Sequence, residues 1–126
     1  MLPNGCWCSW PGRRSRYGCP IGSLALELHE PDPPVREAIA ANFRGWVEHV
    51  QGCLIAAGNR LPAGTDTHQL AVFALSVMEG GVMQARTHRS LETFDAGVAC
   101  LRDYLARLEQ AASAETSHTR PGGVLT

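Results

Sequence analysis

The sequence predicts an all-α domain, a helical bundle of about four helices. Four segments carry apolar residues at helical spacing, and no segment shows a convincing alternation of apolar and polar residues, as a half-buried strand would. A length of 126 residues is enough for one domain with a single core. The hydrophobic content of 44% is ordinary for a globular chain, so it favours neither a disordered nor a membrane protein.

The first two helices are predicted over residues 20–30 and 33–58. Each begins with a proline at its first position, where the missing N–H has no helical partner to lose. The stretch Pro31-Asp32-Pro33-Pro34 ends the first helix, and Asp32 is a favourable N-cap for the second. The second helix has a broad apolar stripe opposite charged residues, and Gly58 allows the left-handed conformation that commonly ends a helix.

The third helix is predicted over residues 67–86, with Asp66 and Gln69 forming a capping box at its start. Its apolar residues extend nearly all round, so we expect it to be buried on several sides. Gly80 and Gly81 lower its helix propensity, and one reason to tolerate them is the close approach of another helix. The positions of this helix assigned to a dimer interface are Leu70, Ala74, Val77 and Gly81.

The fourth helix, predicted over residues 90–110, has a narrower apolar seam with alternating spacings of three and four residues. This spacing suits left-handed helix–helix packing. Beside an apolar third helix, such a seam is expected to be covered by a symmetric copy, giving a homodimer. The seam consists of Leu91, Phe94, Val98, Leu101, Leu105 and Leu108.

The two ends of the chain lack helical periodicity. Residues 1–17 are rich in Gly, Pro and Arg and are predicted to be irregular. Residues 111–126 are small and polar and are predicted to form a disordered tail. The folded domain is therefore expected over residues 18–110.

Charge and composition exclude several classes of function. A net charge of −1 and a pI of about 6.5 argue against DNA binding by this chain alone. Apolar runs are too short to cross a membrane and no secretory signal is recognisable, which predicts a cytoplasmic protein. The spacing of the cysteines and histidines predicts no metal site, and we expect no cofactor. No catalytic constellation is present, so an enzyme ranks as a remote third alternative.

An aromatic and methionine set on the second and third helices has two interpretations. At helical spacing such residues usually form a core, yet they can also line an adaptable apolar cavity. Asn42 and His49 flank the same stripe and could orient a ligand by hydrogen bonds. The candidate ligand-binding residues are Asn42, Phe43, Trp46, Val47, His49, Val50, Leu54, Phe73 and Met78.

Four stretches in order, covering residues 18–109, resemble the C-terminal half of a TetR-family transcriptional regulator. They are "GCPIGSLALEL", "DPPVREAIAANFRGWVEHVQGCLIAA", "LPAGTDTHQLAVFALSVMEGGVMQAR" and "LETFDAGVACLRDYL". The resemblance implies an all-helical domain for effector binding and dimerisation, whose last two helices form a four-helix bundle with those of a partner subunit. The effector is expected to be a small apolar or aromatic molecule.

The sequence departs from this family at its start. Family members carry a helix-turn-helix upstream, and residues 1–17 have nothing that matches one. We therefore expect a truncated or mis-started regulator. The alternative function is a free-standing helical interaction protein that forms heterodimers with full-length relatives and withholds them from DNA.

Overall fold

The computed structural model describes residues 19–27 and 33–118, and in that part of the chain all regular structure is helical. Helix α1 spans Pro20–Glu27, α2 spans Pro33–Ala56, α3 spans Thr67–His88 and α4 spans Glu92–His118. A short 3₁₀ helix, η1, covers Gly58–Arg60. The predicted all-α class is confirmed.

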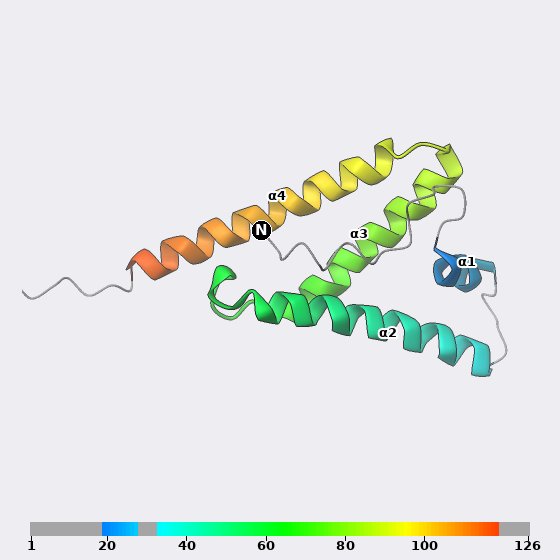
Figure 1. Cartoon of the computed structure of the whole chain (residues 1–126), viewed down its shortest axis with the longest axis horizontal. Coiled ribbons are helices and arrows are strands. Elements are labelled where there is room, and N and C mark those ends of the chain that lie inside the picture. The colour runs from blue at the N-terminus through cyan, green and yellow to red at the C-terminus, as the bar shows by residue number, and fades with distance from the viewer. Residues whose placement is uncertain (1–18, 28–32, 119–126) are drawn as a thin grey trace, which may run out of the picture.

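Helix α3 lies between the other two long helices (Figure 1). It starts beside the C-terminal end of α2 and runs diagonally to the start of α4, while α1 packs beside the opposite end of α2. A helix that contacts neighbours on two sides needs apolar residues around most of its circumference. The seven buried residues of α3 are Leu70, Ala71, Ala74, Leu75, Met78, Gly81 and Ala85.

The core lies where α2, α3 and α4 converge. Leu54 of α2 packs with Leu61, Leu70 and Ala71, and only 2% of its surface is exposed. Partly buried side chains from α2 and α4 surround this cluster: Val47, Val50, Ala57, Leu105 and Leu108. Part of the apolar stripe of α2 is therefore used by the core.

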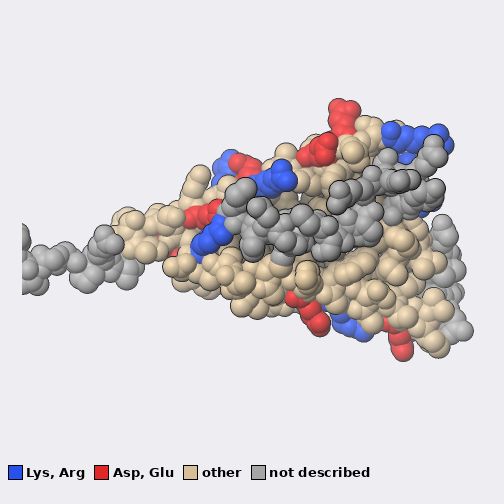
Figure 2. All heavy atoms as spheres, in the orientation of Figure 1, with Lys and Arg blue, Asp and Glu red and all other residues tan. Residues whose placement is uncertain are grey.

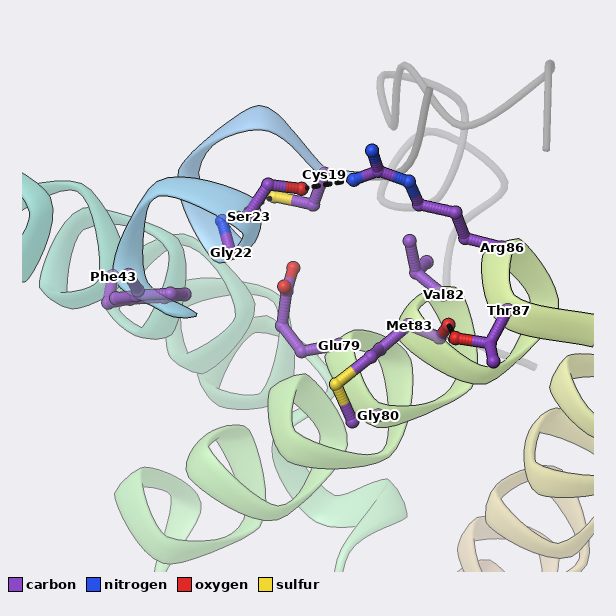
Figure 3. A pocket seen from close by; sticks show the side chains of 11 residues that line it. Cys19, Gly22, Ser23, Phe43, Glu79, Gly80, Val82, Met83, Arg86 and Thr87 are labelled. Atoms are coloured by element: carbon purple, nitrogen blue, oxygen red, sulfur yellow. Dashed lines mark hydrogen bonds between the residues drawn. The ribbon is translucent and has the colours of Figure 1, made fainter. Parts of the chain in front are cut away.

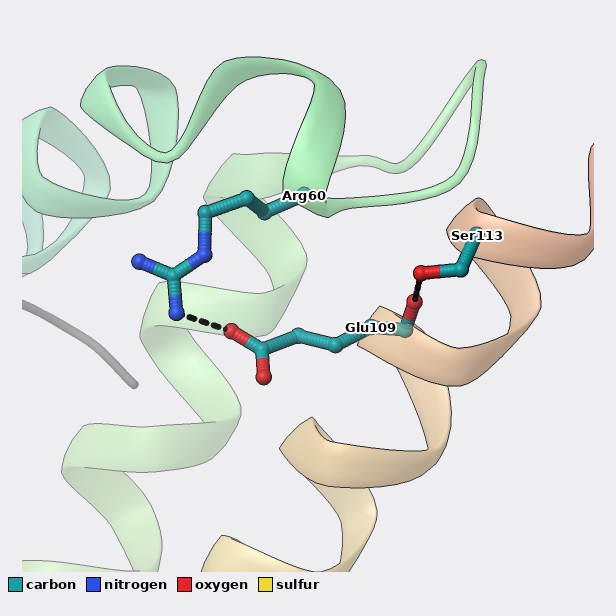
Figure 4. Close-up of polar contacts among 3 residues, drawn as sticks. All are labelled: Arg60, Glu109 and Ser113. Carbon is teal, nitrogen blue, oxygen red and sulfur yellow. Dashed lines mark hydrogen bonds and ion pairs between the residues drawn. The ribbon is translucent and has the colours of Figure 1, made fainter. Parts of the chain in front are cut away.

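The connection between α2 and α3 is fastened to α4 by two charged groups of α4. Arg60 at the end of η1 forms an ion pair with Glu109 (Figure 4). One turn and a half further along α4, Glu115 accepts a hydrogen bond of 3.1 Å from the backbone N–H of Ala63. These contacts hold the C-terminal half of α4 against the loop that leads into α3.

Two of the predicted helix signals are confirmed in detail. The Asp66 carboxylate accepts a 3.0 Å hydrogen bond from the backbone N–H of Gln69, as an N-cap does. Gly58, with a φ of +56°, takes the left-handed conformation just after α2 ends at Ala56. The predicted cap at Asp32 lies outside the described residues.

The prediction of a disordered tail from residue 111 is wrong for its first eight positions. Helix α4 continues to His118, and Ala112 is buried with 3% of its surface exposed. Alanine is the best helix former, and three of these positions are Ala111, Ala112 and Ala114. The hydroxyl groups of Ser113, Thr116 and Ser117 donate hydrogen bonds to carbonyls four residues earlier, so these polar groups are satisfied within the helix. Small polar residues favour disorder only where nothing packs on them, and here α4 packs against η1. Residues 119–126, and the predicted irregular segment 1–17, lie outside the described part of the chain.

Gly81 permits the close approach of α3 and α4. A Cβ atom at this position would lie 2.9 Å from Phe94 Cδ2 and 3.4 Å from Phe94 Cα. The approach expected at the Gly80-Gly81 pair is thus confirmed for Gly81. A Cβ at Gly80 would meet no described atom within 4 Å.

We predict that Gly81→Ala destabilises the domain by about 1–3 kcal/mol, because the added methyl group forces Phe94 and its backbone away from α3. Gly52→Ala is the matched control. Gly52 is exposed within α2, and a Cβ there would meet nothing within 4 Å. The control should therefore gain about 0.5–1 kcal/mol from helix propensity. Urea unfolding followed by circular dichroism measures both changes, and equal stabilisation by the two substitutions would contradict the tight packing.

Candidate functional site

An open cleft of about 560 Å³ lies between α1, α2 and α3 (Figure 3). Helix α1 provides Gly22 and Ser23, the residue directly before it provides Cys19, and α2 contributes Phe43. Helix α3 provides the largest share, from Glu79 to Thr87. The cleft therefore exists because the short α1 packs across the N-terminal half of α2 and the C-terminal half of α3.

The Cys-x-x-Gly sequence that opens α1 has a structural explanation in this cleft. The buried Cys19 sulfur accepts a 3.4 Å hydrogen bond from the backbone N–H of Gly22, as an N-terminal cap would. A Cβ at Gly22 would lie 2.5 Å from Glu79 Oε2, so a side chain at position 22 cannot fit while Glu79 keeps its place. Cysteine and glycine thus let α1 lie directly on the carboxyl group of α3.

Glu79 is the distinctive polar group of the cleft. Its Oε1 atom is buried and has no hydrogen-bond partner in the described structure. Burial raises the pKa of Glu79, and a hydrogen bond with the Cys19 thiol partly opposes that rise. Burial likewise raises the pKa of Cys19, with the nearby Glu79 charge adding to the effect and the Gly22 N–H opposing it. The thiol therefore stays protonated at neutral pH and serves as a weak donor.

Arg86 stands at the rim of the cleft. Its guanidinium Nη1 donates a 2.7 Å hydrogen bond to the Ser23 hydroxyl, which links α3 to α1 (Figure 3). The other lining residues are apolar or small, namely Ala25, Phe43, Gly80, Val82 and Met83, together with the hydroxyl-bearing Thr87. The site thus combines an apolar wall, one partly buried carboxyl group and one cation at its edge.

The candidate ligand-binding residues are distributed over four places, three of which concern α2 and the core. Phe43 lines the cleft, and Trp46 meets it edge to face with ring centroids 5.6 Å apart. Asn42 and His49 are exposed, and the Asn42 amide donates to the Ala38 carbonyl of its own helix. The core takes up the apolar residues Val47, Val50, Leu54 and Met78.

Phe73 lies elsewhere, on the outer face of α3 and α4. Its ring meets that of Tyr104 edge to face at a centroid distance of 5.8 Å, and the two residues are 46% and 45% exposed. A second depression of about 570 Å³ runs from this aromatic pair to the loop at 62–66. Val72 and Met83 are further exposed apolar residues of α3.

Much of the predicted dimer seam is occupied within the chain. Leu101 is 2% exposed, Leu105 and Leu108 pack on the core, and Phe94 lies against Gly81. Of the α3 positions, Leu70, Ala74 and Gly81 are buried, while a Cβ at Gly97 would lie 3.5 Å from Val77 Cγ1. Val98 is partly buried, and Leu91 is 50% exposed. The buried members of this set join α4 to the rest of the chain, and the part of the whole set in a dimer interface stays a prediction.

The sequence prediction of ligand contacts did not include Cys19, Gly22, Glu79 and Arg86. The available signals were the Cys-x-x-Gly pattern and an acidic residue inside an otherwise apolar helix. Neither pattern alone says that the two elements meet, because 57 positions separate Gly22 from Glu79 along the chain. Their contact depends on how α1 packs across α3.

The charged surface offers no single-sign patch on the face shown in Figure 2. Acidic and basic side chains are interspersed along α4 and along the edge of α2. Within residues 19–27 and 33–118, no cluster of three or more His, Cys, Asp or Glu side chains is placed to hold a metal ion. None of the described helices combines the length and apolar character that a bilayer span requires.

The fold and the cleft define a helical domain with a small-molecule-sized cavity between its helices. Residues 12–99 match the family described as the transcriptional regulator LmrA/YxaF-like C-terminal domain of TetR proteins. The chain therefore belongs to this TetR-type C-terminal domain family.

Two curated relatives extend this comparison. Both are uncharacterized HTH-type transcriptional regulators of Mycobacterium tuberculosis, from strains CDC 1551 / Oshkosh and H37Rv. Each is 35% identical over 85 residues, covering 64% of this chain and 42% of the relative. The matched part thus spans less than half of these regulators. No solved structure matches the chain.

We predict that Gly22→Ala and Glu79→Ala are energetically coupled, because the new methyl group occupies the place of the Glu79 carboxyl group. Gly22→Ala should be more harmful in the natural background than in the Glu79→Ala background, with a coupling energy of about 0.5 kcal/mol or more. Chemical unfolding of the four proteins of this double-mutant cycle measures the coupling. Strictly additive effects would show that the two residues do not contact each other in solution.

We also predict a pH-dependent stability difference for Glu79→Gln. Because the pKa of Glu79 is raised in the folded state, the folded protein holds this proton more tightly than the unfolded chain does. The free energy of unfolding therefore falls as pH rises above the unfolded pKa of about 4.3. Glutamine cannot ionise and escapes this loss. The melting temperature of the variant relative to the natural protein should therefore be higher at about pH 7.5 than at about pH 4. The opposite trend would mean that the ionised carboxylate is stabilised in the fold.

Proposed function

We propose that this domain binds a small, largely apolar or aromatic effector and forms a homodimer, as the regulatory part of a TetR-like transcriptional regulator. The cleft between α1, α2 and α3 is the observation that carries the proposal. Its volume of about 560 Å³ falls within the range of small-molecule sites, and its walls are mostly apolar with few polar groups. We place this role in the cytoplasm. The mostly apolar lining of the cleft agrees with ligand binding rather than with catalysis.

The outer face of α3 and α4 supports the dimer proposal. Phe73 and Tyr104 join the two helices there while about half of each side chain remains exposed. Pro62 and Leu108 line the same surface depression and extend its apolar area. Burying such a patch against a symmetric copy is a common way to form a C₂ dimer. The proposed dimer contacts are therefore the outward residues of these helices rather than Leu101 and its buried neighbours.

The alternative role, pairing with full-length relatives, would use the same outer face. A homodimer and a heterodimer differ in the partner chain and not in the chemistry of the surface. On the face shown in Figure 2, the intermixed charges favour protein contact over duplex DNA as the partner.

The effector proposal predicts a ligand-dependent rise in melting temperature. A ligand at about 100 times its dissociation constant stabilises the folded state by about 2.7 kcal/mol. Phe43→Ala should reduce the shift caused by planar aromatic compounds, because it removes part of the apolar wall. Asn42→Ala is the matched control, since Asn42 is exposed and bonded to its own helix. No shift with any compound of a broad aromatic and amphipathic panel would contradict effector binding.

The dimer proposal predicts that Phe73→Glu yields a folded monomer. The half-exposed site tolerates a charge in the free subunit, whereas a paired apolar interface does not. Ile55→Glu, at a 61% exposed position of α2, should leave the dimer intact. Light scattering at micromolar concentration gives the mass, and circular dichroism verifies the fold. A monomeric natural protein, or a dimeric Phe73→Glu variant, would argue against this interface.

A further inference from the structure

We propose that the cleft recognises a protonated aromatic amine, with Glu79 binding the ammonium group and the apolar wall holding the ring. This inference rests on the proposed effector function and names the chemical class of the effector. Its basis is the unusual position of one carboxyl group in an otherwise apolar site.

Among the described residues, no hydrogen-bond donor faces the buried Oε1 atom of Glu79. A buried polar atom that lacks a partner costs free energy, so native structures satisfy nearly all such atoms. The described residues around Glu79 provide one weak donor, the Cys19 thiol, while Gly22 offers no side chain at all. Because the Glu79 side chain lines the cleft, a ligand N–H donor that enters there can approach this carboxyl group, and a small rotation of the side chain brings the carboxylate to it.

The apolar wall agrees with an aromatic ring beside that donor. Phe43 and Met83 line the cleft from α2 and α3, and Val82 adds an aliphatic contact. Methionine and phenylalanine surfaces accommodate flat rings of varied outline, and the face of Phe43 attracts a cation. Amphipathic aromatic amines present both features in one small molecule.

The Arg86 guanidinium, the cation of the cleft, does not occupy the position proposed for the ammonium group of the ligand. Arg86 is at the rim, where its guanidinium is held by Ser23 through a 2.7 Å hydrogen bond. No described contact joins it to Glu79 Oε1. The amine is therefore expected to enter with its charge toward Glu79, and an anionic ligand is disfavoured beside the carboxylate once that group ionises.

Matched ligand pairs test this proposal. A panel of aryl-methylamines, for example 2-naphthylmethylamine, is compared with the corresponding neutral alcohols by isothermal titration calorimetry on the natural dimer or monomer. The amines should bind about ten-fold or more tightly than their alcohols, because a charged hydrogen bond contributes more than a neutral one. Glu79→Gln should remove most of this preference while leaving the alcohol affinity nearly unchanged.

Two controls separate a specific carboxylate from general charge attraction. Glu48→Gln changes the net charge equally, but Glu48 is exposed on α2, so this variant should keep the preference for amines. The preference should also weaken as pH falls through the pKa of Glu79. The other ionisable groups among the described lining residues are Cys19, directly before α1, and Arg86 from α3, and the thiol of Cys19 stays protonated over this range because burial raises its pKa.

The possible outcomes are distinguishable. Equal binding of amines and alcohols to the natural protein would overturn the amine proposal while supporting an effector site. Retention of the amine preference in Glu79→Gln would assign the recognition to another group and also overturn it. Failure of the amines and alcohols to bind, while other compounds of the broad panel raise the melting temperature, would overturn the amine proposal and leave the effector function standing. Failure of every compound of the broad panel would contradict the effector function itself.

Discussion

The arrangement depends on α3 being packed against α2 on one side and α4 on the other. Gly81 lets Phe94 approach the backbone of α3, and Leu70 and Ala71 complete the cluster around Leu54. Because α2 and α4 hold α3 from two sides, the C-terminal half of α3 has a definite position. The short α1 can pack against it there. Both the cleft and the aromatic outer face are consequences of that position.

Sequence periodicity predicted the number, type and order of the helices because each long helix buries a regular apolar face. Asp66 and Gly58 marked boundaries correctly because capping and left-handed conformation depend on local chemistry. The end of α4 was missed for the converse reason. Residues 111–118 have no strong apolar pattern, and the contacts that accompany their helix, such as Glu115 with Ala63, come from a distant loop.

The candidate site was less predictable because it depends on contacts between helices. Periodicity placed Phe43 and Leu54 on one stripe, yet the crossing of α2 over α3 assigns Phe43 to the cleft and Leu54 to the core. The seam of α4 was likewise identified as an apolar contact surface. Which surface it contacts is a tertiary property, and Leu101 is buried within its own subunit. A helical-wheel projection shows which residues share one face of a helix, but it does not show which neighbouring helix covers that face.

One helix therefore carries three roles on its three sides. Its buried side supplies the core, Glu79 and Met83 line the cleft, and Phe73 stands on the outer face. The Arg86–Ser23 hydrogen bond and the close approach of Gly22 to Glu79 both join α1 to α3. In the proposed dimer, α3 would therefore border the effector cleft on one side and the partner subunit on another. A change in the position of α3 would then be the direct route by which the two proposed sites could influence each other.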